Sequence, residues 1–200
     1  MKNLLTFVVL PIVIIGLSIL VIMGIMKPVS FEKEQKVREK RTVERLIDIR
    51  TLQVAYKAEN GKFTSSFDTL IDFYKNGQMR ILRQIGSMDD SLAVAEGRVR
   101  RDTIRVNVRE TVINRAGFVI DSLPFIPTMR DRFLMQSAIK KVSGVDVPLF
   151  EASVPFDVLL RGMDKQLIVN LKDARVKSNR YPGLKVGSIE QPNNNAGNWE

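Results

Sequence analysis

The sequence predicts an α+β protein, in which an N-terminal transmembrane helix and a helical stalk precede a small antiparallel-sheet domain. Residues 4–26 are apolar and carry no charge, residues 31–57 repeat apolar side chains at helical spacing, and residues 103–112 alternate apolar and polar side chains as a strand does. The predicted organisation is an N-terminal tail at 1–3, an anchor at 4–26, a stalk at 27–60, an α+β domain at 61–187 and a flexible tail at 188–200.

The opening apolar run is long enough to cross a bilayer. As a helix it would extend about 34 Å, against about 30 Å of hydrocarbon. A cleaved secretory signal has a shorter apolar region and a small-x-small cleavage site, and residues 27–30 (KPVS) offer no such site. A fully buried helix of a soluble protein is the other alternative. We expect an uncleaved anchor, in which the residues that contact lipid include Leu4, Phe7, Ile12, Gly16, Leu20 and Ile25.

Two observations disagree about the side of the membrane on which the domain lies. Lys and Arg are concentrated after the apolar run, and the positive-inside rule then places the domain in the cytoplasm. A short N-terminal tail, one span and a large domain are instead the layout of an exported signal-anchor protein. We favour the second arrangement, with a single-pass protein in the cytoplasmic membrane and a periplasmic or extracytoplasmic domain.

Residues 31–57 predict one long helix with two different halves. The first half, residues 31–41, is mostly charged, with opposite charges at i,i+4 spacing that suit a solvated stalk. The second half has one apolar stripe, which we expect to pack on the protein's own sheet or, alternatively, on a partner helix. The residues of this stripe are Val43, Leu46, Ile49, Leu52 and Tyr56.

Proline and glycine mark the two ends of the stalk. Pro28 predicts a kink between anchor and stalk, because proline disfavours a helical residue before it, here Lys27. Asn60-Gly61 predicts the end of the helix, since both residues tolerate the left-handed conformation of a C-cap.

The first half of the domain predicts one helix and two strands. Ser65 or Ser66 is the expected N-cap of a helix that ends at Asn76-Gly77. Residues 78–85 predict a short strand, and residues 87–98 a loop or short helix. The clearest strand covers residues 103–112, with valines and isoleucine on a buried face and Arg105 and Arg109 on an exposed face.

The second half predicts a hairpin. The runs 133–142 and 145–154 flank Ser143-Gly144, and Pro148 restricts the second strand to an edge or a bulge. Residues 155–163 predict a short helix, and residues 166–175 fit either helix or strand. The asparagine-rich segment 188–200 is expected to be exposed and flexible unless Trp199 docks against the domain.

Composition argues against catalysis. The chain has neither histidine nor cysteine, so the commonest general base, the commonest metal ligand and all thiol chemistry are missing. Asp68 and Asp72 lie at i,i+4 spacing but provide two ligands where calcium takes six to eight. We expect a non-enzymatic protein without catalytic, cofactor-binding or metal-binding residues and without a cofactor. An enzyme would instead require a deep pocket with converging Asp, Lys or Ser side chains.

The net charge of +9 bears on partners. Basic residues beside a membrane are attracted to anionic headgroups by about 1 kcal/mol each, and basic charge can also indicate nucleic-acid binding. No nucleic-acid-binding motif is present, so we expect a membrane partner, together with an envelope protein or a second copy, and no nucleic acid or small-molecule substrate. Arg105 and Arg109 could contact an acidic partner or could simply keep an exposed face soluble.

The segment from Asp48 to Leu70 resembles the stalk-to-domain region of type II secretion pseudopilins and type IV pilins. It carries D-I-R-T-L, then A-Y-K, then E-N-G-K-F, after an apolar helix. The resemblance implies an exported pilin-like domain with a structural or assembly role in the cell envelope. The chain departs from that family because no Gly precedes a Phe-x-x-x-Glu in the apolar run, which also lacks the family's glutamate. The ending also resembles uncharacterised bacterial single-pass membrane proteins.

A second function remains open at this point. The domain could instead face the cytoplasm, tethered to the membrane, where its basic surface would recruit anionic lipid or an acidic protein.

Overall fold

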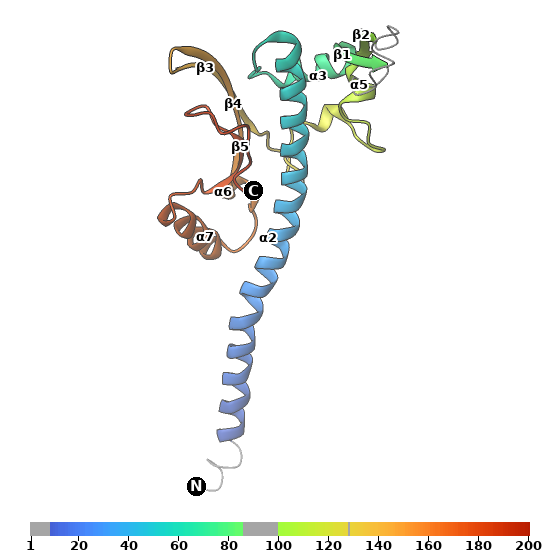
Figure 1. Ribbon diagram of the computed structural model, residues 1–200. Coiled ribbons are helices and arrows are strands. Elements are labelled where there is room, and N and C mark those ends of the chain that lie inside the picture. The colour runs from blue at the N-terminus through green and yellow to red at the C-terminus, as the bar shows by residue number, and fades with distance from the viewer. Residues whose placement is uncertain (1–8, 86–99, 128) are drawn as a thin grey trace, which may run out of the picture.

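The computed structural model describes residues 9–85, 100–127 and 129–200, and its main axis is one helix, α2, from Leu10 to Asn60. At 51 residues this helix is about 76 Å long. A sheet of three strands lies on one side of its second half, and a smaller helix with a two-stranded arm lies on the other side (Figure 1). The predicted α+β class, with a long N-terminal helix and small antiparallel sheets, is confirmed.

The helix α2 passes through the predicted junction without ending there. Lys27 and Pro28 both lie inside it, so the described part of the predicted anchor and the predicted stalk form one continuous helix. Proline removes a single backbone donor, which a long helix can tolerate. The other end is as predicted, because Gly61 adopts φ 73° and its N–H donates to the carbonyl of Lys57 at 2.8 Å.

The second half of α2 is the centre of the hydrophobic core. Leu46, Ile49 and Leu52 are fully buried there, and Val43 and Tyr56 pack against the same core from its edge. The predicted apolar stripe therefore packs on the protein's own domain, the first of the two alternatives. These side chains are covered, and the stripe is not a free surface for a partner helix.

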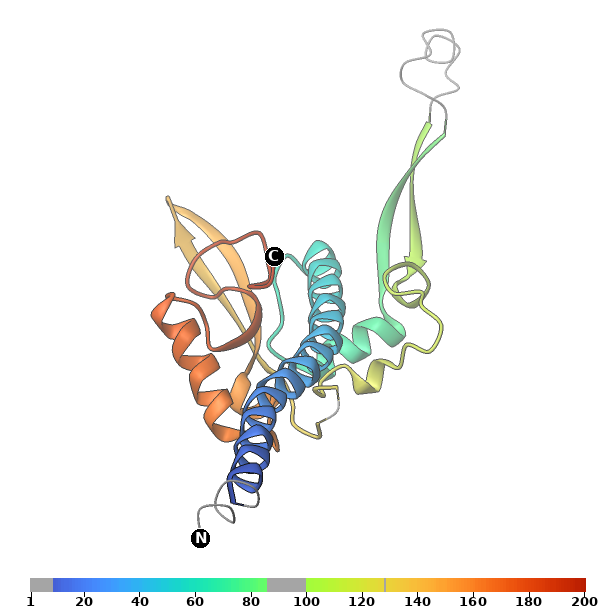
Figure 2. The ribbon, with the colours of Figure 1, turned by 90° about the horizontal axis from the view of Figure 1, so that it is seen from below.

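The helix α3, from Phe67 to Asn76, starts and ends as predicted. The side chain of Ser66 accepts a hydrogen bond from the N–H of Thr69 at 3.4 Å, and Gly77 follows the last turn. Strand β1 (Gln78–Ile85) comes next and pairs antiparallel with β2 (Arg100–Asn107), from Gln78 opposite Asn107 to Ile85 opposite Arg100. This two-stranded arm projects from the body of the protein (Figure 2). The loop predicted at 87–98 lies outside the described residues.

The second strand is shorter than predicted, which corrects the placement of Arg109. β2 ends at Asn107, and the chain continues as the short helix α5 (Val108–Thr111). The pairing partner β1 begins at Gln78, so the ladder has no further residue beyond Asn107. A helical turn there buries Val108 completely, whereas an extended chain would leave it beyond the end of the ladder. Arg105 and Arg109 therefore do not share one strand face.

The larger sheet contains the predicted hairpin. Its strands are β3 (Leu134–Val142), β4 (Val145–Pro155) and β5 (Gly183–Gly187), hydrogen-bonded in that order, and the 3-10 helix η2 (Ile120–Ser122) precedes them. Ser143 and Gly144 form the turn with φ values of 51° and 85°, as a two-residue hairpin turn of primed type requires. Pro148 pairs only with Ile139, because β5 reaches β4 only from Glu151 to Pro155. At Pro148, β4 therefore has a neighbouring strand on one side only, as an edge strand does, although from Glu151 onward β4 lies between β3 and β5.

Two helices separate β4 from β5. The first, α6, is short and runs from Phe156 to Leu159, as predicted. The second, α7, runs from Lys165 to Lys177, which settles the ambiguous segment as helical. Asp164 explains this outcome, because its carboxylate accepts hydrogen bonds from the N–H groups of Gln166 at 2.9 Å and Leu167 at 3.2 Å and so caps the helix.

The segment 188–200 is folded against the sheet, which corrects the predicted flexible tail. Gly197 forms a bridge with Val186 of β5, and Trp199 packs on the core. Asn198 accepts a hydrogen bond from the N–H of Lys185 and donates one to the carbonyl of Gly183. The asparagines that suggested flexibility are turn residues, because the neighbouring Asn194 and Asn195 have φ values of 54° and 58°. The folded unit thus extends on both sides of the predicted 61–187 domain.

In the part of the chain that the structure describes, no helix has both the length and the apolar character expected of a membrane span. The lipid-facing positions that were predicted lie on α2 or before it. Ile12 and Gly16 are exposed, Leu20 and Ile25 are described only by their helical backbone, and Leu4 and Phe7 precede the described residues.

Candidate functional site: a cleft between α2, the 61–66 loop and the hairpin

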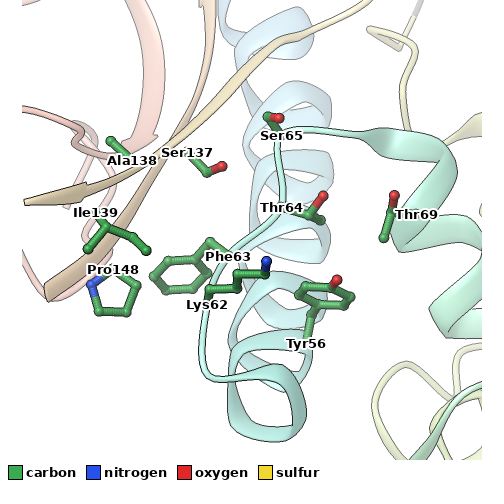
Figure 3. Close-up of a pocket in the computed structure, with 10 residues that line it drawn as sticks. All are labelled: Tyr56, Lys62, Phe63, Thr64, Ser65, Thr69, Ser137, Ala138, Ile139 and Pro148. Carbon is green, nitrogen blue, oxygen red and sulfur yellow. The ribbon is translucent and has the colours of Figure 1, made fainter. Parts of the chain in front are cut away.

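A cleft of about 420 Å³ lies where the C-terminal end of α2 and the following loop face the β3–β4 hairpin. Figure 3 shows Tyr56, Thr64 and Thr69 on one side and the hairpin residues on the other, with Phe63 between them. The hairpin wall consists of Ser137, Ala138, Ile139 and Pro148.

A buried glutamine positions the loop that forms one wall. The amide of Gln53, which has no exposed surface, donates to the carbonyl of Thr64 at 2.6 Å and accepts from the N–H of Thr64 at 3.2 Å. Phe63 also packs against the ring of Phe150, at 4.8 Å between ring centroids. The loop is therefore fixed on both sides, so the cleft is preformed.

The cleft offers polar groups for hydrogen bonding and a single charged side chain. Its polar groups are neutral hydroxyls and one cation, Lys62, and no carboxylate lines it. Within the described residues, no hydrogen bond joins the Lys62 amine to a hydroxyl of the cleft. A serine nucleophile needs a neighbouring base in hydrogen-bond reach, and the chain has no histidine to provide one. Nor do the described residues contain a cluster of three or more acidic side chains that could hold a metal ion.

Away from the cleft, Arg45 and Asp48 of α2 belong to a cluster of charged and polar side chains. Asp48 is buried, and its Oδ2 accepts from Nη2 of Arg115 at 2.8 Å. Burial raises the pKa of the Asp48 carboxyl, an effect that the Arg115 guanidinium opposes. Burial likewise lowers the pKa of Arg45, whose Nη1 donates to Oγ of Ser122 at 2.6 Å. This cluster joins α2 to the 115–122 segment, so its role is structural.

Of the predicted interaction residues, only Tyr56 lies at the cleft. Arg105 is exposed on the arm, and Arg109 lines a separate hollow of about 390 Å³ beside Tyr74 and Phe118. Sequence reasoning missed the cleft itself. The available signal was the aromatic residue two positions after the capping Gly61, since the loop after a helix end commonly places an apolar side chain back on the core.

Comparisons with protein-family models, curated proteins and solved structures found no match to this chain.

Proposed function

We propose that this chain is a single-pass, membrane-anchored envelope protein with a structural or assembly role, whose pilin-like domain is exported and catalyses no reaction. The anchor in this proposal is the apolar run 4–26, of which residues 4–8 precede the described part of the helix.

The observation that supports an anchor is the uncovered apolar surface of the first half of α2. Four consecutive residues, 12–15, are large, apolar and exposed, and successive helical residues point about 100° apart, so they cover every side of the helix. Burial of apolar surface is worth about 25 cal/mol per Å². A helix exposed in this way requires an apolar surrounding, and lipid provides one on all sides. The exposed set is Val9, Leu10, Ile12, Val13, Ile14, Ile15, Leu17, Ile19 and Val21.

The site supports a role without catalysis. The preformed cleft offers hydroxyls, an apolar floor and one lysine, without an acid–base pair, and the long helix packed against an antiparallel sheet is consistent with a pilin-like arrangement. A long helix with a domain packed on its second half suits a part of a larger assembly, because it fixes the position of the domain relative to the anchor.

Membrane fractionation tests the anchor. We expect the full chain to remain with the membrane pellet after an alkaline carbonate wash and to require detergent for release. The double variant Ile15→Lys and Leu17→Lys should shift it toward the supernatant, since each lysine costs about 3 kcal/mol near the centre of a span. The matched control Val54→Lys, at an exposed position of the same helix, should stay in the pellet. Recovery of the unmodified chain in the supernatant would overturn the proposal.

The alternative is a tethered domain that faces the cytoplasm and recruits anionic lipid or an acidic protein. The concentration of Lys and Arg after the apolar run favours it. Reporters fused after Glu200 separate the two: a reporter active only in the periplasm supports export, and one active only in the cytoplasm supports the alternative.

A further inference from the structure

The end of the domain that lies nearest the N-terminal half of α2, here called its underside, extends along the helix as far as Lys27. A hollow of about 300 Å³ is formed jointly by α2, through Lys27 and Phe31, and by the α6–α7 loop, through Met163 and Asp164. Phe31 is half-buried and packs against the core of the domain. The folded domain therefore begins one helical turn after Pro28, and residues 27–41 are not a free stalk that holds it away from the anchor.

A second hollow of about 480 Å³, also largely apolar, adjoins the first and shares Met163 with it. It lies between the α6–α7 loop and the first turns of α7, where Ile168 forms part of the wall and Val169 is 46% exposed. Gly162, at φ 88°, turns the loop, and the space around its α-carbon is open. Apolar side chains thus line a surface that nothing in the described residues covers.

Three acids and three cations line the two hollows, and most of them are engaged within the domain. Asp157 pairs with Lys172, Glu34 pairs with Arg38, Arg161 pairs with Asp131, and the carboxylate of Asp164 caps α7. Lys27 and Lys165 are exposed and have no ion-pair partner within the described ranges. The surface therefore has an apolar centre, and the cations at its rim that have no ion-pair partner in the described ranges are these two lysines.

The position of this surface along α2 matches the headgroup layer of a membrane entered at Met26. Phe31 lies about 7 Å above Met26 along the helix. The polar layer on each side of the hydrocarbon is roughly 5 to 7 Å thick. On the basis of the anchor proposed above, we propose that Phe31, Met163 and Val169 contact phospholipids of that membrane, and that Lys27 and Lys165 bind their phosphates. The partner of the underside is thus the bilayer surface itself. Apolar stems with charged tips suit this depth, because each part meets its preferred environment.

Single-cysteine labelling tests the contact in the full chain, because the native sequence has no cysteine. The variants Met163→Cys, Val145→Cys and Ile12→Cys each carry one fluorophore and are reconstituted in vesicles of phosphatidylcholine and phosphatidylglycerol. Val145, 64% exposed, adjoins the β3–β4 turn at the opposite end of the domain (Figure 1). Nitroxide lipids labelled at the headgroup or deep in the acyl chain act as quenchers.

We expect headgroup nitroxides to quench the probe at position 163 several-fold more than the probe at position 145, and deep nitroxides to quench the probe at position 12. Equal weak quenching at 163 and 145, with strong quenching at 12, would overturn the lipid contact and leave the anchor standing. Weak quenching at all three positions would overturn both. A fourth variant, Met163→Cys with Lys165→Glu, should show weaker headgroup quenching, while unchanged Trp199 emission shows that the domain remains folded.

Discussion

Arg50 of α2 and Glu200 form an ion pair, with 2.6 Å between Nη1 and Oε1, across 150 positions of sequence. The same guanidinium donates to the carbonyl of Asn195 at 3.4 Å. The hydrogen bond from Arg50 lowers the pKa of the Glu200 carboxyl below its ordinary value of 4.5. Arg50 thus ties the 188–200 segment to the helix that forms the centre of the core.

Removal of this guanidinium should loosen the segment around Trp199. Because Trp199 is the only tryptophan, Arg50→Ala should shift its emission to longer wavelength and make it easier to quench with acrylamide. Lys36→Ala, which breaks the exposed pair with Glu32, should leave the emission unchanged. Acid should act like Arg50→Ala, since a carboxylate with a lowered pKa stabilises the fold fully above its unfolded-state pKa of 4.5 and loses the effect as the pH falls through its lower folded-state pKa. Identical emission of Arg50→Ala and the unmodified chain would contradict the prediction.

Asn198 should contribute more to stability than its place near the end of the described chain suggests. Its side chain satisfies the N–H of Lys185 and the carbonyl of Gly183 at the edge of β5. Asn198→Ala leaves both groups without this partner and should lower the free energy of unfolding by about 1 to 3 kcal/mol. Gln191→Ala, at an exposed position, should change it by less than about 0.5 kcal/mol. Urea titrations compare the two, and equal midpoints would argue against an ordered segment.

The apolar stripe of α2 should behave as core. Leu52 has no exposed surface, so Leu52→Ala should cost about 2 to 5 kcal/mol through lost burial and the resulting cavity. Val54, two residues further on and 46% exposed, provides the comparison, and Val54→Ala should cost less than about 0.5 kcal/mol. Denaturant unfolding of both variants measures the difference. A stripe that served a partner helix would give a small effect at Leu52 in the isolated protein.

Asp48 should give folding a measurable pH dependence. Its pKa is raised in the folded state, above the ordinary value of 3.8, so the folded protein binds more protons than the unfolded chain between the two values. Stability from this site is therefore lost as the pH rises through that window. Asp48→Asn does not titrate, so its unfolding free energy relative to the unmodified chain should increase as the pH rises from below 3.8 to neutrality. Urea titrations at stepped pH measure this difference, and a constant difference would contradict the prediction.

The sequence was sufficient to predict those features that depend only on neighbouring residues. The C-cap at Gly61, the N-cap at Ser66 and the turn at Ser143-Gly144 each depend on one or two residues and their immediate neighbours, and each lies where it was predicted. The stripe on α2 was found for the same reason, since its spacing is visible in the sequence and its burial follows.

The predictions were wrong for segments whose structure depends on contacts with distant parts of the chain. Val108 fits a strand and a helical turn equally well, and the end of the β1 ladder selects the turn. Asn198 fits a polar tail until β5 provides partners for its amide. The cleft could not be predicted because its walls come from residues 56–69 and 137–148, and the sequence alone does not show that these meet.

The unbroken course of α2 has a rotational consequence. Each residue of an α-helix turns the chain by about 100° and advances it by about 1.5 Å. One residue inserted between Pro28 and Phe31 would therefore rotate the sheet, the arm and the cleft by about 100° around the helix axis relative to the residues before Pro28, and would move them only about 1.5 Å along it. In one continuous helix, the number of residues between two positions sets the angle between them around the helix axis, so the length of the segment before Phe31 sets the direction in which the domain faces.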